Sequence, residues 1–126
     1  MKMPRFKPLT NHEILLYAKG IPHFRGVFMK DTLPRKPWKR ESGVVNLDVD
    51  AGPGTHWVAY KKIENTVVYF DSYGNLRPPI EIENYFKNCT IYFNHHRFQH
   101  RSATNCGQMC LYFLYTQPNN LILRVL

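Results

Sequence analysis

The segment Asn105–Cys110, NCGQMC, contains the residue with the greatest capacity for covalent chemistry, Cys106. Nucleophilic catalysis by a thiol needs a thiolate, an imidazole that holds its proton, a group that orients the imidazole, and donors for the oxyanion. Cys106 follows a polar loop and lies at the predicted first turn of a helix, where unpaired N–H groups and the helix dipole lower a thiol's pKa. Gly107 leaves room for a substrate carbonyl beside the Cys106 backbone N–H. We therefore take Cys106 as the candidate nucleophile and Gly107 as a candidate substrate-binding residue.

The partners that such a thiol requires are provided by His56 and Asp71. His56 lies at the start of a predicted strand, just past the turn Gly52–Gly54, and Asp71 ends the next predicted strand. If the two strands form a hairpin around Glu64 and Asn65, residues 56 and 71 face each other across it. Asp71 can then orient the His56 ring.

Buried cysteines are the competing interpretation of the same residues. Cys110 lies one helical turn beyond Cys106 in an apolar segment, where a cysteine usually acts as a small buried hydrophobe. Cys89, which precedes a predicted strand, has the same interpretation. A Cys, a His and an Asp can be chosen from many sequences of this size, so their spacing alone leaves open a protein without catalysis.

The elements that must position these residues follow from turn residues, caps and apolar runs. Thr10 and Glu13 form a capping-box pattern at the start of a helix. β-branched and aromatic runs separated by turn residues indicate neighbouring strands. We expect helices at 11–19, 78–87 and 106–115, and strands at 26–29, 43–47, 55–61, 66–70 and 90–94. Residues 121–126 fit either a helix or a strand. The third helix has no polar face and should be buried.

The predicted fold class is α+β, with a mixed or antiparallel central sheet flanked by helices that pack on one side of it. A chain of 126 residues, 44% hydrophobic, can bury one core, which predicts a single domain over residues 1–126. No apolar run reaches the roughly 18 residues that cross a bilayer, and MKMPRFKPLT lacks the apolar stretch of a secretory signal. Three cysteines, an odd number, argue against a disulfide framework. We expect a soluble, intracellular monomer with reduced thiols.

The charge balance favours a polyanionic partner. Seventeen Lys and Arg against nine Asp and Glu give a net charge of +8. The segment from 35 to 40 places four basic residues around Trp38, which suits phosphate contacts and base stacking. These candidate DNA-binding residues are Arg35, Lys36, Lys39 and Arg40. A solvated basic loop explains the segment equally well, because no helix-turn-helix, zinc finger or RNA-recognition motif accompanies it.

Three runs together carry a family resemblance. They are GPGTHWVAY at 52–60, YFDSYG at 69–74 and FQHRSATNCGQMCLYFL at 98–114. In this order they resemble the adenovirus endopeptidase (adenain) family and its relatives in Maverick/Polinton transposons and adinto-like viruses. These proteins are in turn similar to the ubiquitin-like-protein proteases. The stretch at 22–48 also resembles the family's N-terminal part, so the likeness covers most of residues 10 to 115.

The resemblance implies a papain-like, adenain-like cysteine protease fold with the nucleophile at a helix N-terminus. It assigns His56 as the base, Asp71 as its acidic partner, Cys106 as the nucleophile and Gln99 as the side-chain donor to the oxyanion. In the family, the position of Trp57 lies beside the substrate cleft. A core aromatic in a strand is an equally good interpretation of Trp57.

The activity implied is that of a cysteine endopeptidase acting through an acyl-enzyme. Its substrates would be viral or transposon precursor proteins, cleaved at Gly-Gly or Gly-X sites, because a narrow cleft admits glycine where larger side chains collide. The chemistry requires no cofactor, but some relatives are activated by a short peptide and by DNA. The expected partners are a polypeptide substrate and DNA, with no membrane, and the expected location is intracellular, in the host nucleus or a virion if the protein is viral.

Three alternatives remain open at this point. The same chemistry serves a deconjugating protease for ubiquitin-like modifiers, and a catalytically silent protease fold could act as a basic DNA-binding protein. A zinc module is the third, although its spacings match no standard finger or ribbon. Its candidate ligands would be Cys89, His95, His96, His100, Cys106 and Cys110.

Overall fold

The computed structural model describes residues 3–5, 7–48, 56–98, 104–118 and 120–126. The helical elements are α1 (Asn11–Tyr17), the 3-10 turn η1 (Ala18–Gly20), α2 (Ile80–Tyr85) and α3 (Cys106–Thr116). The strands are β1 (Phe24–Met29), β2 (Arg40–Asn46), β3 (Trp57–Ile63), β4 (Thr66–Phe70), β5 (Thr90–Asn94) and β6 (Leu123–Val125).

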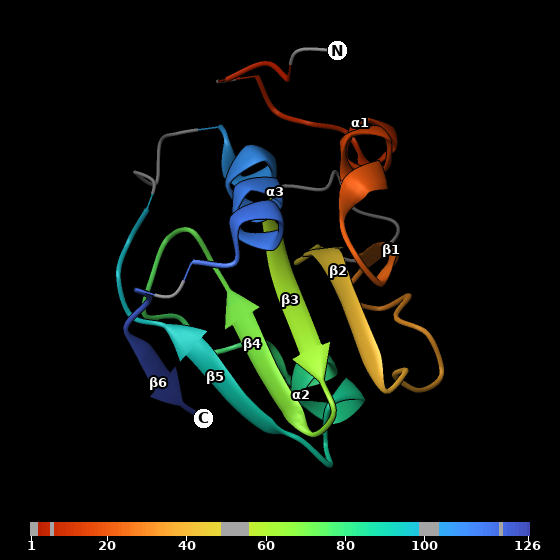
Figure 1. Ribbon diagram of the computed structural model, residues 1–126, viewed down its shortest axis with the longest axis vertical. Coiled ribbons are helices and arrows are strands. Elements are labelled where there is room, and N and C mark those ends of the chain that lie inside the picture. Colours follow the sequence, from red (N-terminus) through yellow and green to blue (C-terminus); the bar gives the residue numbers. More distant parts are fainter. Residues whose placement is uncertain (1–2, 6, 49–55, 99–103, 119) are drawn as a thin grey trace.

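The described strands form one mixed sheet of six, in the order β1-β2-β3-β4-β5-β6 (Figure 1). β1 pairs with β2 and β4 with β5 in parallel, whereas the β2–β3, β3–β4 and β5–β6 pairs are antiparallel. The predicted α+β class is therefore confirmed. The last segment, for which the sequence allowed a helix or a strand, contributes the edge strand β6.

Helices cover both faces of this sheet, so the expectation that they pack on one side was wrong. Val44 of β2 belongs to a core shared with α1 and α3, while its neighbour Val45 belongs to a second core that includes Ile82 of α2. The alternation arises because successive side chains of a strand point to opposite faces. The parallel pair β4–β5 needs a crossover connection, and α2 lies in that crossover, on the face away from α3 (Figure 1).

The first helix begins as predicted and ends earlier. Thr10 Oγ1 accepts from the Glu13 amide at 3.2 Å, and Glu13 Oε1 accepts from the Thr10 amide at 3.1 Å, which completes the capping box. The α-helical part stops at Tyr17, and the 3-10 turn η1 completes the segment predicted as one helix. The second helix is shorter than predicted at both ends, because Pro79 is its N-cap and Phe86 its C-cap.

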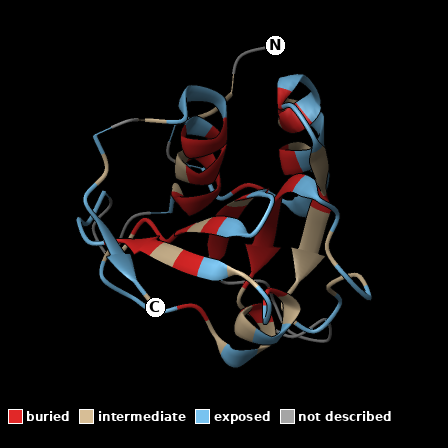
Figure 2. Ribbon diagram, turned by 60° about the horizontal axis from the view of Figure 1, so that its bottom comes forward, coloured by how far each residue is buried: buried red, intermediate tan, exposed pale blue. Residues whose placement is uncertain are grey.

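The third helix begins at Cys106 and packs its buried side against the sheet (Figure 2). Phe113 stacks on Phe70 of β4, with ring centroids 4.8 Å apart and planes within 8°. The prediction of a helix buried all round was wrong, since Tyr112 is 60% exposed and Tyr115 is 48% exposed. Tyrosine tolerates such a place because its ring end carries a polar group.

Candidate active site

The site is built where the start of α3 meets the start of β3. Cys106 is the first residue of α3 and is buried. Its Sγ accepts a hydrogen bond from the backbone N–H of Trp57 at 3.5 Å. The sulfur therefore lies against the backbone of β3 immediately after His56.

The His56 ring is held between Asp71 and Cys106. Its Nε2 lies 2.9 Å from Asp71 Oδ1, and the exposed fractions of the two side chains are 12% and 2%. Among the residues described, the buried Nδ1 has no hydrogen-bond partner. Nδ1 is thus left as the ring nitrogen that can exchange a proton with the Cys106 thiol, while Asp71 fixes the other end of the ring.

The hairpin that brings these strands together has a different register from the predicted one. Ile63 pairs with Thr66 and Ala59 with Phe70, and continuing this register places residue 56 opposite residue 73 rather than 71. The prediction that residues 56 and 71 face each other in the ladder was therefore wrong by two residues. Asp71 reaches His56 through its side chain, and the ring of Tyr73 lies on the His56 ring instead.

The electrostatics of the pair favour a thiolate and an imidazolium. Burial disfavours the charged His56 ring, but its hydrogen bond to Asp71 and the adjacent Cys106 sulfur outweigh burial and raise the pKa of His56 to about 9. Burial also opposes the Cys106 thiolate, yet the adjacent His56 imidazole and hydrogen bonds from the Trp57 and Gly107 amides lower the Cys106 pKa. With a pKa of about 9, His56 is protonated near neutral pH, and the lowered pKa of Cys106 favours the thiolate beside it.

Cys110 behaves as the opposite kind of thiol. It is fully buried one turn behind Cys106, and burial raises its pKa well above the usual value. A protonated thiol in an apolar core is chemically inert. The two cysteines of one helix are thus electrostatically distinct.

Asn94, at the end of β5, anchors the acidic residue and was missed by sequence reasoning. The Asn94 side chain pairs with the Asp71 backbone like another strand: Oδ1 accepts from Asp71 N–H at 2.8 Å and Nδ2 donates to Asp71 O at 2.8 Å. Nδ2 also donates to His96 O at 3.0 Å. A buried polar residue at a strand end was the available signal, but asparagine there is more commonly a turn residue.

The two candidate substrate-binding residues lie in the core facing α1. The Trp57 ring is buried, and its Nε1 donates to Leu9 O at 3.0 Å. Gly107 is buried as well, and a Cβ at this position would lie 3.2 Å from Leu9 Cβ and 3.4 Å from Ile14 Cδ1. Close packing of α3 on α1 therefore gives a reason for glycine at 107. A substrate-binding role for either residue stays a prediction.

Gln108 is a further buried polar residue next to the nucleophile. Its Nε2 donates to Pro4 O at 2.9 Å and to Lys7 O at 2.6 Å, which ties the N-terminal segment to the first turn of α3. Gln99, the expected side-chain donor to the oxyanion, lies outside the described residues. His100, one of the alternative zinc ligands, does too.

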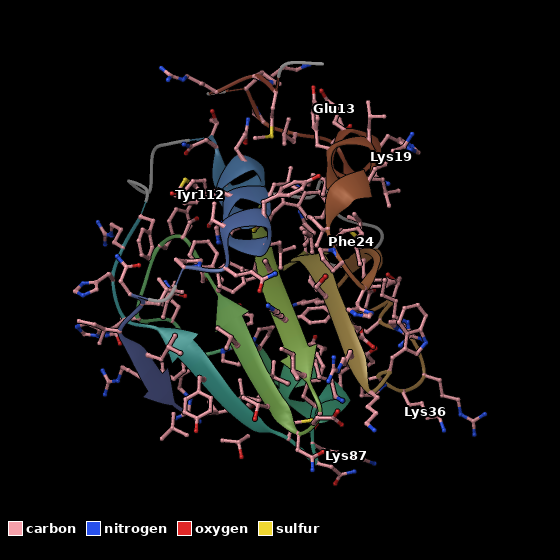
Figure 3. The ribbon with its side chains drawn as sticks, in the orientation of Figure 1. Glu13, Lys19, Phe24, Lys36, Lys87 and Tyr112 are labelled. Atoms are coloured by element: carbon pink, nitrogen blue, oxygen red, sulfur yellow. The ribbon has the colours of Figure 1, made fainter. Side chains whose placement is uncertain are left out.

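The basic residues lie apart from this site, in the loop before β2 and at its first residue. All four are exposed: Arg35, Lys36, Lys39 and Arg40. Figure 3 shows Lys36 at the edge of the molecule opposite Tyr112 of α3. The loop is anchored by Glu41, whose Oε1 accepts from the Trp38 amide at 2.6 Å, and the Arg25 guanidinium lies 4.4 Å from the Trp38 ring centroid. Contact with a polyanion at this loop stays a prediction.

No group of three or more His, Cys, Asp or Glu side chains within the described ranges is arranged to hold a metal ion. None of the helices in those ranges has the length and apolar character needed to span a membrane.

Comparison with known proteins gives limited similarity. No family model matches the sequence, and no curated protein matches it. Among solved structures, the chain is similar to the crystal structure of the selenomethionine-labelled ASFV pS273R protease, with a TM-score of 0.49 and 24% sequence identity. The match covers 69% of this chain and 37% of that one, so this chain aligns with little more than a third of that protease.

Proposed function

We propose that this protein is a cysteine-type endopeptidase in which Cys106 is the nucleophile, His56 the general base and acid, and Asp71 the residue that orients the imidazole. One observation carries the proposal. The His56–Asp71 hydrogen bond of 2.9 Å adjoins a thiol at a helix start, and the pKa values of His56 and Cys106 are shifted in opposite directions. Such paired shifts are typical of catalytic sites.

The reaction follows from the positions of these groups. The Cys106 thiolate attacks the scissile carbonyl carbon, a C–S bond forms, and the carbonyl electron pair moves to oxygen. The backbone N–H at the start of α3 and the Gln99 side chain are proposed to donate to this oxyanion. The imidazolium of His56 gives its proton to the leaving amine as the C–N bond breaks.

Hydrolysis of the thioester completes the cycle. Neutral His56 takes a proton from water, the resulting hydroxide attacks the acyl carbon, and the C–S bond breaks. Cys106 leaves as a thiolate and His56 is again protonated, so the ion pair is restored. Asp71 stays ionised throughout and stabilises the imidazolium by its hydrogen bond.

The proposed substrates are precursor polypeptides cleaved after small residues at Gly-Gly or Gly-X sites. The resemblance of the runs around His56, Asp71 and Cys106 to the adenovirus endopeptidase family supports this substrate class. A folded ubiquitin-like modifier with a Gly-Gly tail is the alternative substrate, and competition between the two substrate types separates them.

The first test is selective alkylation followed by intact-protein mass spectrometry. With brief iodoacetamide treatment at about pH 6, the wild type should gain one adduct on Cys106, whereas His56→Ala should react at the slow rate of free cysteine. Cys110→Ala is the matched control and should label like the wild type.

Hydrolysis of a peptide containing a Gly-Gly site should be lost in Cys106→Ala and retained in Cys110→Ala. Equal hydrolysis by both variants would refute Cys106 as the nucleophile.

A further inference from the structure

Tyr73 lies face to face with His56 in an arrangement that distinguishes the two protonation states of the imidazole. The ring centroids are 4.2 Å apart and the planes are within 5° of parallel. Stacking of two aromatic rings is favourable in either protonation state. A cation over the face of a tyrosine ring is in addition attracted by the negative charge of that face, which only the protonated imidazole can use. The geometry therefore suits an imidazolium better than a neutral imidazole.

The position of the Tyr73 ring is fixed through its backbone. The Tyr73 N–H donates to Asp71 Oδ1 at 2.9 Å, the same oxygen that contacts His56. Gly74 N–H donates to Asp71 O at 2.9 Å, which closes the turn. Gly74 has a φ of +78°, and a Cβ there would lie 2.5 Å from the backbone of His96 and Arg97. The turn is thus set by its neighbours, and the ring is held where it stacks.

Besides Tyr73, two charged groups act on the His56 ring. Asp71 follows β4 and Cys106 begins α3, and within the described residues these two groups contribute most to raising the pKa of His56. Asp71 binds at the ring edge, through Nε2. Tyr73 differs because it contacts the face of the ring.

We propose that Tyr73 is a positioning residue of this site, whose ring holds the His56 imidazole in plane with Asp71 and Cys106 and stabilises its protonated form. The inference deepens the proposed function, because an imidazolium beside Cys106 keeps the nucleophile ionised. It concerns His56 itself, so it can be tested without any substrate.

The test is an NMR titration of the His56 ring in the full chain, with the resonance identified by its loss in His56→Ala. Tyr73→Phe keeps the ring face and should leave the pKa of His56 unchanged within about 0.3 units, whereas Tyr73→Leu should lower it by about 0.4 to 1.5 units. Tyr112→Leu removes an exposed tyrosine from α3 and is the matched control, with no shift expected.

A second series covers the case in which Tyr73→Leu does not fold or admits water. Phenylalanine and pentafluorophenylalanine placed at position 73 have nearly the same shape, but fluorination reverses the charge distribution of the ring face. The pKa of His56 should fall from the first to the second, and Cys106 alkylation at about pH 6 should slow with it. An identical pKa in both would overturn the proposal. Absence of peptide hydrolysis with the expected pKa series would refute the proposed function and leave this inference intact.

Discussion

Asn94→Asp replaces one side-chain atom next to Asp71 and tests whether Asn94 holds Asp71, and through it His56, in place. In the wild type, Asn94 Nδ2 donates to the carbonyl oxygens of Asp71 and His96, at 2.8 and 3.0 Å. The substitution replaces this amide nitrogen with a carboxylate oxygen of nearly the same size. Two donated hydrogen bonds are lost, and a negative oxygen then faces two carbonyl oxygens in a residue that is 1% exposed.

The expected destabilisation follows from these contacts. Each lost hydrogen bond removes about 0.5 to 1.5 kcal/mol, and an uncompensated buried charge costs about 3 to 5 kcal/mol when it cannot relax. We expect the free energy of unfolding to fall by about 4 to 7 kcal/mol at neutral pH, where protonation of the carboxyl limits the charge penalty to about 4 kcal/mol. Protonation relieves the repulsion, so the pKa of the introduced carboxyl is raised in the folded state. Its penalty is smallest below the unfolded pKa of about 3.9 and grows as pH rises through the folded pKa.

Urea unfolding at about pH 7 and pH 5 measures this effect, with Asn84→Asp as the control. Asn84 is exposed on α2, and its substitution should change stability by less than about 0.5 kcal/mol. The rate of Cys106 alkylation should also fall in Asn94→Asp, because Asp71 no longer holds His56 in place. A variant as stable as the wild type at both pH values would refute the proposed role of Asn94.

Three further predictions concern the pair, the helix start and the basic loop. The pKa of His56 is raised to about 9, so the stability that its ion pair contributes is fully present below about pH 6.5 and should be lost as pH rises through about 9. Urea unfolding of the wild type and His56→Ala across this pH range measures the loss. Gly107→Ala places a methyl group 3.2 Å from Leu9 Cβ and should destabilise the protein by about 1 kcal/mol, measured by thermal unfolding; an unchanged Tm would mean that α1 yields easily. Replacing Arg35 and Lys36 together by Ala should weaken binding to duplex DNA, and the slope of its salt dependence should fall by the equivalent of about two phosphate contacts. Equal affinity of the double variant and the wild type would exclude the loop from the DNA contact.

Local patterns in the sequence predicted most of the elements. The Thr10–Glu13 capping box is present, and the strand predicted at 90–94 has those bounds. Such features depend on neighbours in the chain, which the sequence displays directly. The pairing of the central hairpin was wrong because it depends on the turn: Glu64 has a φ of +53°, and Ile63 pairs directly with Thr66 across it.

The features that sequence reasoning missed depend on distant segments. Asn94 and Asp71 are 23 residues apart, and no local pattern indicates that an amide at one strand end completes the backbone pairing of another. The face of the sheet chosen by α2 depends on the direction of its crossover, which periodicity does not encode. The burial of Glu41, which is 1% exposed, could not be predicted either, because a carboxylate is rarely buried without partners. Its partners Arg25 and Tyr85 lie far from it in the sequence.

The labelling rates of the two thiols of α3 can also be compared to measure conformational opening of the fold. Cys106 should react from the native state at a rate set by its ionisation, whereas Cys110 is fully buried and reacts only after α3 leaves the sheet. In one sample, the ratio of the two labelling rates separates a disturbed site from a loosened fold. Any ligand that slows Cys110 labelling without changing Cys106 labelling binds the folded chain away from the nucleophile. The labelling rates of the two cysteines can therefore detect ligands of this protein before any substrate is known.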